Sequence, residues 1–264
     1  MRPDPVAFVW EWEWATPLGI ALIVTQVVYV LLWARGGFGP RRAHLGWGRL
    51  VAFTLGLGVV VIALMSPIGA NDERFLSLHM VAHDLLIWIA APLLLLGGVP
   101  VLRDTDWLPR PLQRALAILT HPVVAWSLST ALLWVWHAPP AYGFALESDI
   151  VHGVEHLCFL VGYVIYWWPL IVPPWDIGWL RGNTARALYL LAGMVQSALL
   201  GALITFHRTV LYTAYLHVPG ATPASALADQ RLAGAIMWFP GAVVFAIAAI
   251  LVIGKRAPQP VSSS

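Results

Sequence analysis

The sequence predicts an all-α integral membrane protein, built as a bundle of about seven transmembrane helices. Of its 264 residues, 59% are hydrophobic and only 11% are charged, whereas a soluble domain normally carries about 25% charged residues. The mean hydropathy is +0.76. The apolar residues fall into seven runs, most of them about as long as a membrane crossing. So few charged side chains cannot cover a surface that is exposed to water. We therefore expect the helices to be surrounded by lipid.

The seven runs lie at 18–34, 50–65, 75–98, 116–136, 151–172, 187–206 and 232–253. A single run of this kind can be a buried helix of a soluble protein. Seven in succession, with almost no polar face, predict a polytopic membrane protein. We expect one membrane domain over residues 1–264, with a short disordered tail at 255–264. The loop 208–231 is expected to be irregular, with room for a short helix at the membrane interface.

Alternate loops differ in positive charge. One set holds eleven basic residues and the other set holds four. The eleven are Arg35, Arg41, Arg42, Arg49, Arg103, Arg110, Arg114, Arg181, Arg186, Lys255 and Arg256. The positive-inside rule predicts that these loops are cytoplasmic, which places the N-terminus outside and the C-terminus in the cytoplasm. The net charge of +2 and the absence of a basic patch do not indicate binding to nucleic acid.

Seven of the nine histidines fall on the outer side of this topology. His79 and His83 form one pair at i, i+4 spacing near the start of the third run, and His152 and His156 form a second pair near the start of the fifth. Residues at this spacing share a helix face, and both pairs are predicted at a similar depth. His137 ends the fourth run at the same level. His207 and His217 lie in the long outer loop.

This pattern favours a metal site. Two neutral imidazoles on one helix face can converge on a transition metal. Met80, Met237 and Cys158 are soft donors near this level, although Cys158 is better explained as a small apolar residue. Imidazole with thioether suits copper, and imidazole with carboxylate also suits zinc or iron. Asp84 and Glu155 are the carboxylates at this depth, either as ligands or as acceptors that orient the histidine rings.

The same residues are also compatible with a structural role and with two different chemistries. Intramembrane histidines often form hydrogen bonds between helices, and Met80 points about 100° away from His79 around the helix, which is compatible with simple packing. A zinc ion with Asp84 or Glu155 as general base would make an intramembrane hydrolase. Two histidines from different helices could also ligate a haem.

Four stretches resemble the polytopic CtaG family of cytochrome c oxidase assembly factors, which is associated with caa-type oxidases. They are HMVAHDLL (79–86), WHAPPAYGFAL (136–146), HGVEHLCFLVGYVIYWWPL (152–170) and DQRLAGAIMWFPG (229–241). The chain departs from the family pattern at Ala82 and Arg231, where glutamine is expected. Neither position is a candidate ligand.

The resemblance implies an assembly factor, and not an enzyme, in the plasma membrane of a bacterium. Its expected partners are the subunits of a haem–copper oxidase and an extracytoplasmic copper chaperone. The expected cargo is copper. We expect His79, His83, His152 and His156 to hold the ion, with His137 as a further ligand or a gate and with Met80 and Met237 helping to pass it on.

Overall fold

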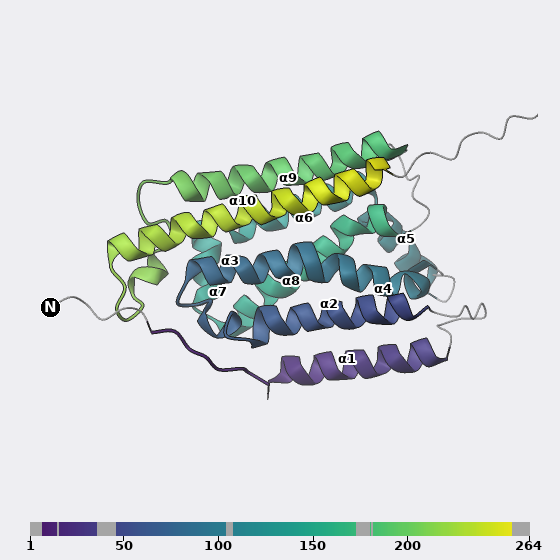
Figure 1. Cartoon of the computed structure of the whole chain (residues 1–264), viewed down its shortest axis with the longest axis horizontal. Helices are drawn as coiled ribbons and strands as arrows, with labels where there is room; N and C mark the ends of the chain where they lie inside the picture. Colours follow the sequence, from purple (N-terminus) through teal and green to yellow (C-terminus); the bar gives the residue numbers. More distant parts are fainter. Residues whose placement is uncertain are drawn as a thin grey trace, which may run out of the picture.

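The computed structural model describes residues 7–14, 16–35, 46–103, 108–172, 180 and 182–254, and these form helices and no strands. The long helices run side by side along the molecule (Figure 1). The α-helices are α1 (Pro17–Ala34), α2 (Trp47–Met65), α3 (Leu76–Asp84), α4 (Ala91–Arg103), α5 (Arg110–Leu119), α6 (Pro122–Trp136), α7 (Pro139–Leu146), α8 (Asp149–Ile171), α9 (Gly182–Phe206) and α10 (Pro223–Gly254). Shorter segments are η1 (Gly69–Asn71), η2 (Leu85–Ala90) and η3 (Thr213–Leu216).

Five helical stretches among the described residues are long and apolar enough to cross a membrane, and the bent pair α5–α6 raises the number to six. The remaining predicted crossing, 232–253, falls within α10, a helix of 32 residues. The count of seven crossings and the orientation of the termini stay predictions. The tail 255–264 lies outside the described residues, as do His44 and the basic residues Arg41, Arg42, Arg181, Lys255 and Arg256.

The fourth predicted run, 116–136, is not one straight helix. α5 ends at Leu119 and α6 begins at Pro122, and their axes differ by 71°. Proline has no backbone N–H and its ring clashes with the preceding turn, so α5 cannot continue through Pro122. The same residue suits the first position of a new helix, where the missing donor is not needed.

The third predicted run is continuous but changes its winding. η2 is a π-helical segment that joins α3 to α4 and directly follows His83 and Asp84. The carbonyl of Ile87 within it accepts a hydrogen bond from Nε1 of Trp167 on α8, at 3.0 Å. π-Helical segments are rare and are frequent at functional sites. This one fixes how the third run lies against α8.

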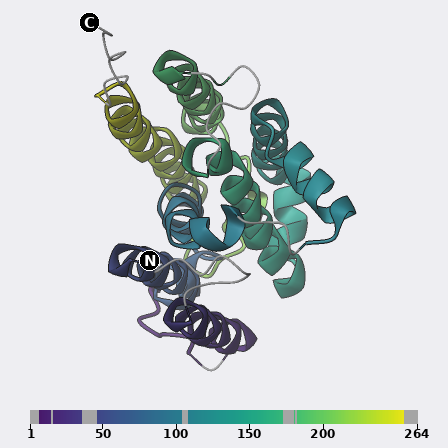
Figure 2. The same ribbon diagram turned by 90° about the vertical axis from the view of Figure 1, so that its right-hand side faces the viewer.

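The rod formed by α3, η2 and α4 lies with α8 in the middle of the bundle. Seen from the end, α1 and α2 lie at one edge, α9 and α10 at another, and α5 and α6 at a third (Figure 2). In the most apolar window of each helix, 56% of the residues are buried in Leu76–Gly98 and 50% in Asp149–Ile171, against 11% in α1. The two central helices therefore carry side chains shielded from the surroundings.

The α9–α10 pair depends on small residues. A Cβ atom on Gly201 would lie 2.7 Å from the carbonyl oxygen of Gly234, so only glycine allows this approach. α10 also begins earlier than predicted and shortens the expected loop 208–231, in which η3 is a short helical turn. The hydroxyl of Thr222 accepts a hydrogen bond from the backbone N–H of Ser225 at 3.1 Å, which caps α10 ahead of Pro223.

Candidate metal centre

The two histidine pairs occupy equivalent places on the two central helices. His79 and His83 follow the first residue of α3, Leu76, by three and seven positions, and His152 and His156 follow the first residue of α8, Asp149, by the same intervals. α3 and α8 begin at the same end of the bundle, where α7 also lies (Figure 1). We call this end the histidine end. The i, i+4 spacing then brings all four rings to one level, as the sequence predicts.

The four rings form one buried group, which we call the histidine cluster. His79 stacks on His152 with ring centroids 5.1 Å apart, and His79 and His83 are 4.2 Å apart. Between the helices, His83 lies 5.2 Å from His156. No residue of the four is more than 8% exposed. The structure therefore brings together the four histidines predicted from spacing.

Of the two predicted carboxylates, one joins the cluster. Glu155 is fully buried, and its Oε1 lies 3.7 Å from Nε2 of both His79 and His83. Asp84 lies one residue beyond His83 and about 100° around the helix. Its Oδ1 accepts a hydrogen bond from Nε1 of Trp88 at 3.1 Å. Glu155 is therefore placed to bind or orient at the cluster, and Asp84 contacts the indole instead.

Two further carboxylates reach the cluster from the turn that precedes α3. Oδ2 of Asp72 lies 3.6 Å from Nε2 of His152, and Oε1 of Glu73 lies 3.6 Å from Nδ1 of the same ring. Burial raises the pKa of Asp72 to about 7, against the opposing effect of His152, whereas interaction with His152 lowers the pKa of Glu73. The sequence did not single out either acid as a site residue. The one feature of the sequence that could have indicated these acids is their position a few residues before His79, the first histidine of the first pair.

His137 and Met80 meet beside the cluster. His137 caps the C-terminus of α6, and its ring centroid lies 5.6 Å from that of His83. Its Nδ1 lies 2.8 Å from the carbonyl oxygen of Leu133, which only accepts, so Nδ1 carries the proton. In the neutral ring Nε2 then presents a lone pair. The atom that this lone pair faces, at 3.3 Å, is Sδ of Met80, which is fully buried.

Three tyrosines hold the loop segments around the site. The hydroxyl of Tyr215 in η3 donates to the carbonyl oxygen of Asp72 at 2.8 Å and lies 2.6 Å from the hydroxyl of Tyr142. The hydroxyl of Tyr212 donates to the carbonyl oxygen of His137 at 2.9 Å. Burial raises the pKa of Tyr212 and of Tyr215, so both hydroxyls keep the proton that they donate. The long loop therefore positions Asp72 and His137.

α10 supplies the cap of α3. The carboxylate of Asp229 accepts hydrogen bonds from the backbone N–H of Ser77, at 3.3 Å, and from its hydroxyl. Phe75, at the N-cap position of α3, offers no side-chain acceptor. A carboxylate at the first turn satisfies an N–H that the helix leaves unpaired and interacts favourably with the helix dipole. Asp229 thus fixes the turn that carries His79.

The remaining candidates lie apart from the cluster. His207 and His217 are exposed, and Nδ1 of His207 lies 2.9 Å from the carbonyl oxygen of Thr209. Met237 on α10 is buried against α9. Its Cβ lies close to Gly201, at 3.2 Å from the place that a Cβ atom on that glycine would take. Cys158 is a free, partly buried thiol on α8. The predicted role of Met237 in passing an ion stays a prediction.

Several polar atoms of the cluster have no hydrogen-bond partner among the described residues. They are both ring nitrogens of His79 and of His83, Nε2 of His152 and of His156, and both carboxylate oxygens of Glu155. Leaving such groups buried and unpaired costs about 1–3 kcal/mol each. A cation would satisfy lone pairs on several of them at once. The donor set of imidazoles and carboxylates suits a transition metal ion.

Comparison with known proteins identifies the family. Residues 27–257 match the model of the cytochrome c oxidase caa3 assembly factor (CtaG) family. The chain belongs to this family. The helices described above suit a multi-pass membrane protein.

The curated relatives are themselves longer proteins. Uncharacterised proteins of Mycobacterium bovis and Mycobacterium tuberculosis are each 30% identical to this CtaG-family chain over 247 residues, which cover 86% of the chain and 36% of the relative. A relative from Mycobacterium leprae is 29% identical over 256 residues, or 89% of the chain and 38% of the relative. The chain thus spans just over a third of their length. No solved structure matches the chain.

Proposed function

We propose that this chain binds copper at the histidine cluster and supplies it to a haem–copper cytochrome c oxidase during assembly. The observation that carries the proposal is the set of buried imidazole nitrogens without hydrogen-bond partners among the described residues. Histidines that only tie helices together would donate or accept hydrogen bonds between helices. His79 and His83 do neither with either ring nitrogen, and an unpaired arrangement of this kind is stabilised by a bound cation.

The contact between His137 and Met80 favours copper over a harder ion. With the proton of His137 on Nδ1, the lone pair of Nε2 faces the lone pairs of a thioether sulfur at 3.3 Å. These two groups cannot form a hydrogen bond in the neutral ring, but both can bind one soft ion. A thioether binds Cu(I) without losing a proton, and it is softer than the oxygen ligands that harder ions prefer. His137 and Met80 are therefore proposed to receive the ion from the cluster.

The remaining parts of the proposal concern surroundings and partners. Family membership supports a role beside the oxidase subunits, in a bacterial plasma membrane. The excess of basic residues in the loops opposite the histidine end favours an extracytoplasmic cluster. Copper would then arrive from an extracytoplasmic chaperone. In this function the chain transfers an ion by ligand exchange and performs no covalent chemistry.

The direct test is metal binding by the purified full-length chain under reducing conditions. We expect the wild-type chain to bind Cu(I), and we expect His79→Ala combined with His83→Ala to reduce its affinity by at least about 100-fold, since two ligands are lost. His207→Ala combined with His217→Ala is the matched control, because both of these rings are exposed and lie outside the cluster. Equal binding by the two double variants would contradict the proposal.

The same preparation separates the alternatives. Zinc bound in place of copper, with hydrolysis of a lipid amide or peptide that Glu155→Gln abolishes, would point to a hydrolase. A Soret band would point to haem. In cells, deleting the gene should lower cytochrome c oxidase activity, and added copper should restore part of it. The deletion strain can also be complemented with the His79→Ala, His83→Ala variant. If this variant restores oxidase activity as fully as the wild-type gene does, a purely structural scaffold is favoured.

A further inference from the structure

The metal-binding atoms at the histidine end divide into two groups that share one residue. Asp72, His79, His152 and His156 form the first group, and His79, His83 and Glu155 form the second. Within each group the ligand atoms lie within 4.8 Å of one another. Opposite ligands of a single ion with bonds of about 2.0–2.3 Å are separated by about 4–4.6 Å. The limit of 4.8 Å is slightly above this separation, so each group closes onto one ion after a small movement of its side chains.

Resting on the proposed function, we infer that the cluster offers two alternative positions to one copper ion, which moves between them while His79 stays bound. The first group is the cavity position and the second group is the deep position. In this arrangement, the ligands of the cavity position other than His79 leave as His83 and Glu155 bind. A shared ligand spares the ion a fully dissociated state, which lowers the barrier to transfer.

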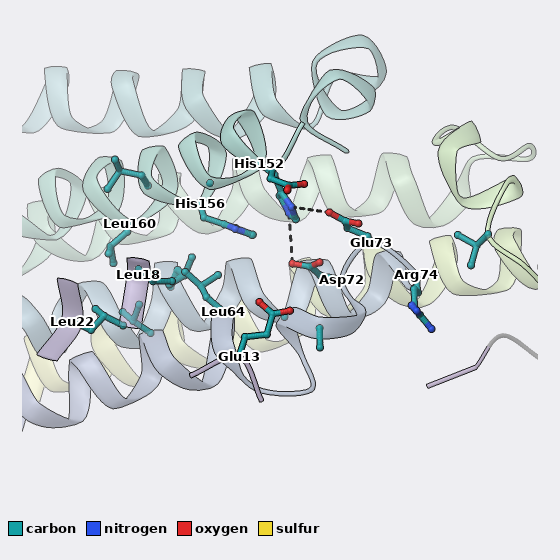
Figure 3. A pocket seen from close by; sticks show the side chains of 18 of the residues that line it. Glu13, Leu18, Leu22, Leu64, Asp72, Glu73, Arg74, His152, His156 and Leu160 are labelled. Carbon is teal, nitrogen blue, oxygen red and sulfur yellow. Dashed lines mark ion pairs between the residues drawn. The ribbon is translucent and has the colours of Figure 1, made fainter. Parts of the chain in front are cut away.

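Access from outside supports the order of the two positions. A cavity of about 900 Å³ opens beside α1, α2 and α8, and three residues of the cavity position, Asp72, His152 and His156, line it. His83 and Glu155 do not line it and are at most 2% exposed. Figure 3 shows His152 above Asp72, with Glu73 to one side of it and His156 to the other, in this cavity. An ion that enters there meets the cavity position first.

The cavity is suited to attract a cation. Besides Asp72, its lining includes the carboxylates of Glu13, Glu73 and Asp149, against one basic side chain, Arg74. A cleft lined mainly by one sign of charge concentrates ions of the opposite sign. Within the cavity, Glu73 contacts one ring nitrogen of His152 and Asp72 contacts the other (Figure 3).

Each position contains one carboxylate, and a softer donor lies next to the deep position. The cavity position adds a carboxylate from the turn before α3 to three imidazoles. At the deep position, the ring of His83 lies 5.6 Å from the ring of His137, which contacts the sulfur of Met80. Carboxylates suit harder ions and thioethers suit Cu(I). The thioether of Met80 therefore offers Cu(I) a softer ligand beyond the deep position, which gives the movement a direction without any redox step.

The test uses three variants of the full-length chain in detergent. Asp72→Asn with His152→Ala removes the cavity position, His83→Ala with Glu155→Gln removes the deep position, and His79→Ala weakens both. Cu(I) affinity is measured by competition with a chromophoric chelator, and uptake by stopped flow. Glu147→Gln with His217→Ala is the matched control, because both residues are exposed and lie outside the two groups. Helical circular dichroism shows which variants fold.

We expect the wild type to bind one ion per chain. Each position-specific variant should still bind one ion, with a loss of less than about tenfold in affinity, because the other position remains. Their combination, and His79→Ala alone, should lose at least about 100-fold. The variant without the cavity position should also take up copper more slowly than the variant without the deep position.

Three results would overturn the inference, and each has a distinct meaning. If one position-specific variant that folds abolishes binding, all the donors belong to a single site, and copper binding stands while the two positions do not. If the wild type binds two ions at once, the positions are not alternatives for one ion. If the wild type binds no Cu(I), the proposed function itself is wrong, together with the inference that rests on it.

Discussion

At the scale of single residues, the contrast between Glu155 and Asp84 decides which buried acid serves the cluster. Both lie beside a histidine in sequence, at His156 and His83, and both are carboxylates within the bundle. Glu155 has no hydrogen-bond donor among the described residues and contacts two imidazoles. Asp84 accepts a hydrogen bond from Trp88. The two acids therefore have different roles although their sequence contexts are similar.

This contrast predicts the effects of two conservative substitutions. In the Asp72→Asn, His152→Ala background, Glu155→Gln should weaken Cu(I) binding by at least about tenfold, because a charged ligand becomes a neutral amide. Asp84→Asn should change it by less than about twofold, because the amide oxygen can still accept from Trp88. Chelator competition measures both. An equal loss in the two variants would place Asp84 among the ligands.

At the scale of elements, the start of α3 depends on a residue far away in sequence. Ser77 and Asp229 are separated by 152 positions, and their contact joins α10 to the turn that carries His79. α3 also continues into the π-helical segment η2, where Trp167 of α8 donates to Ile87. α3 is therefore held at both ends by neighbouring helices, which fixes the rotation of its histidine face.

The cap predicts a graded effect on stability. Asp229→Ala should destabilise the folded chain by about 1 kcal/mol, the usual cost of removing a helix cap. Asp229→Asn should keep most of that stability, because asparagine also accepts from the N–H of Ser77. Thermal unfolding in detergent, followed by circular dichroism, measures the difference, with the exposed Glu147→Ala as control. Equal losses for Ala and Asn would show that the charge of Asp229, and not the cap, matters.

At the scale of the whole molecule, polar chemistry is concentrated at one end of an otherwise apolar bundle. Asp72, Glu73, His152 and His156 lie together at the histidine end and line the cavity (Figure 3). Long exposed apolar surfaces, as on α1, run along the sides. A bundle of this kind delivers copper only if the histidine end faces the compartment from which copper arrives.

The orientation can be tested with single cysteines. In a Cys158→Ala background, Glu147→Cys reports on the histidine end and Arg110→Cys reports on the opposite end, since both positions are exposed. We expect an impermeant thiol reagent to label the first variant in intact cells and the second only after permeabilisation, as the positive-inside rule requires. The reverse pattern would place the cluster in the cytoplasm and remove the extracytoplasmic route for copper.

The sequence by itself determined the class of the fold and the core of the candidate site. Apolar runs and a shortage of charge follow from composition, and the i, i+4 pairs His79/His83 and His152/His156 share a face because helix geometry is local. For most helix ends, the position predicted from the sequence therefore lies within a few residues of the end in the structure. The break before Pro122 also had a local signal, because proline interrupts a helix.

Only the tertiary structure decided which groups join the histidines. Asp72 and Glu73 come from a turn whose path depends on contacts with the distant Tyr215, and Glu155 rather than Asp84 faces the rings because of how α3 and α8 are rotated against each other. Such choices depend on packing between residues far apart in the chain, which local periodicity does not contain. For the same reason, the division into a cavity position and a deep position became visible only in three dimensions.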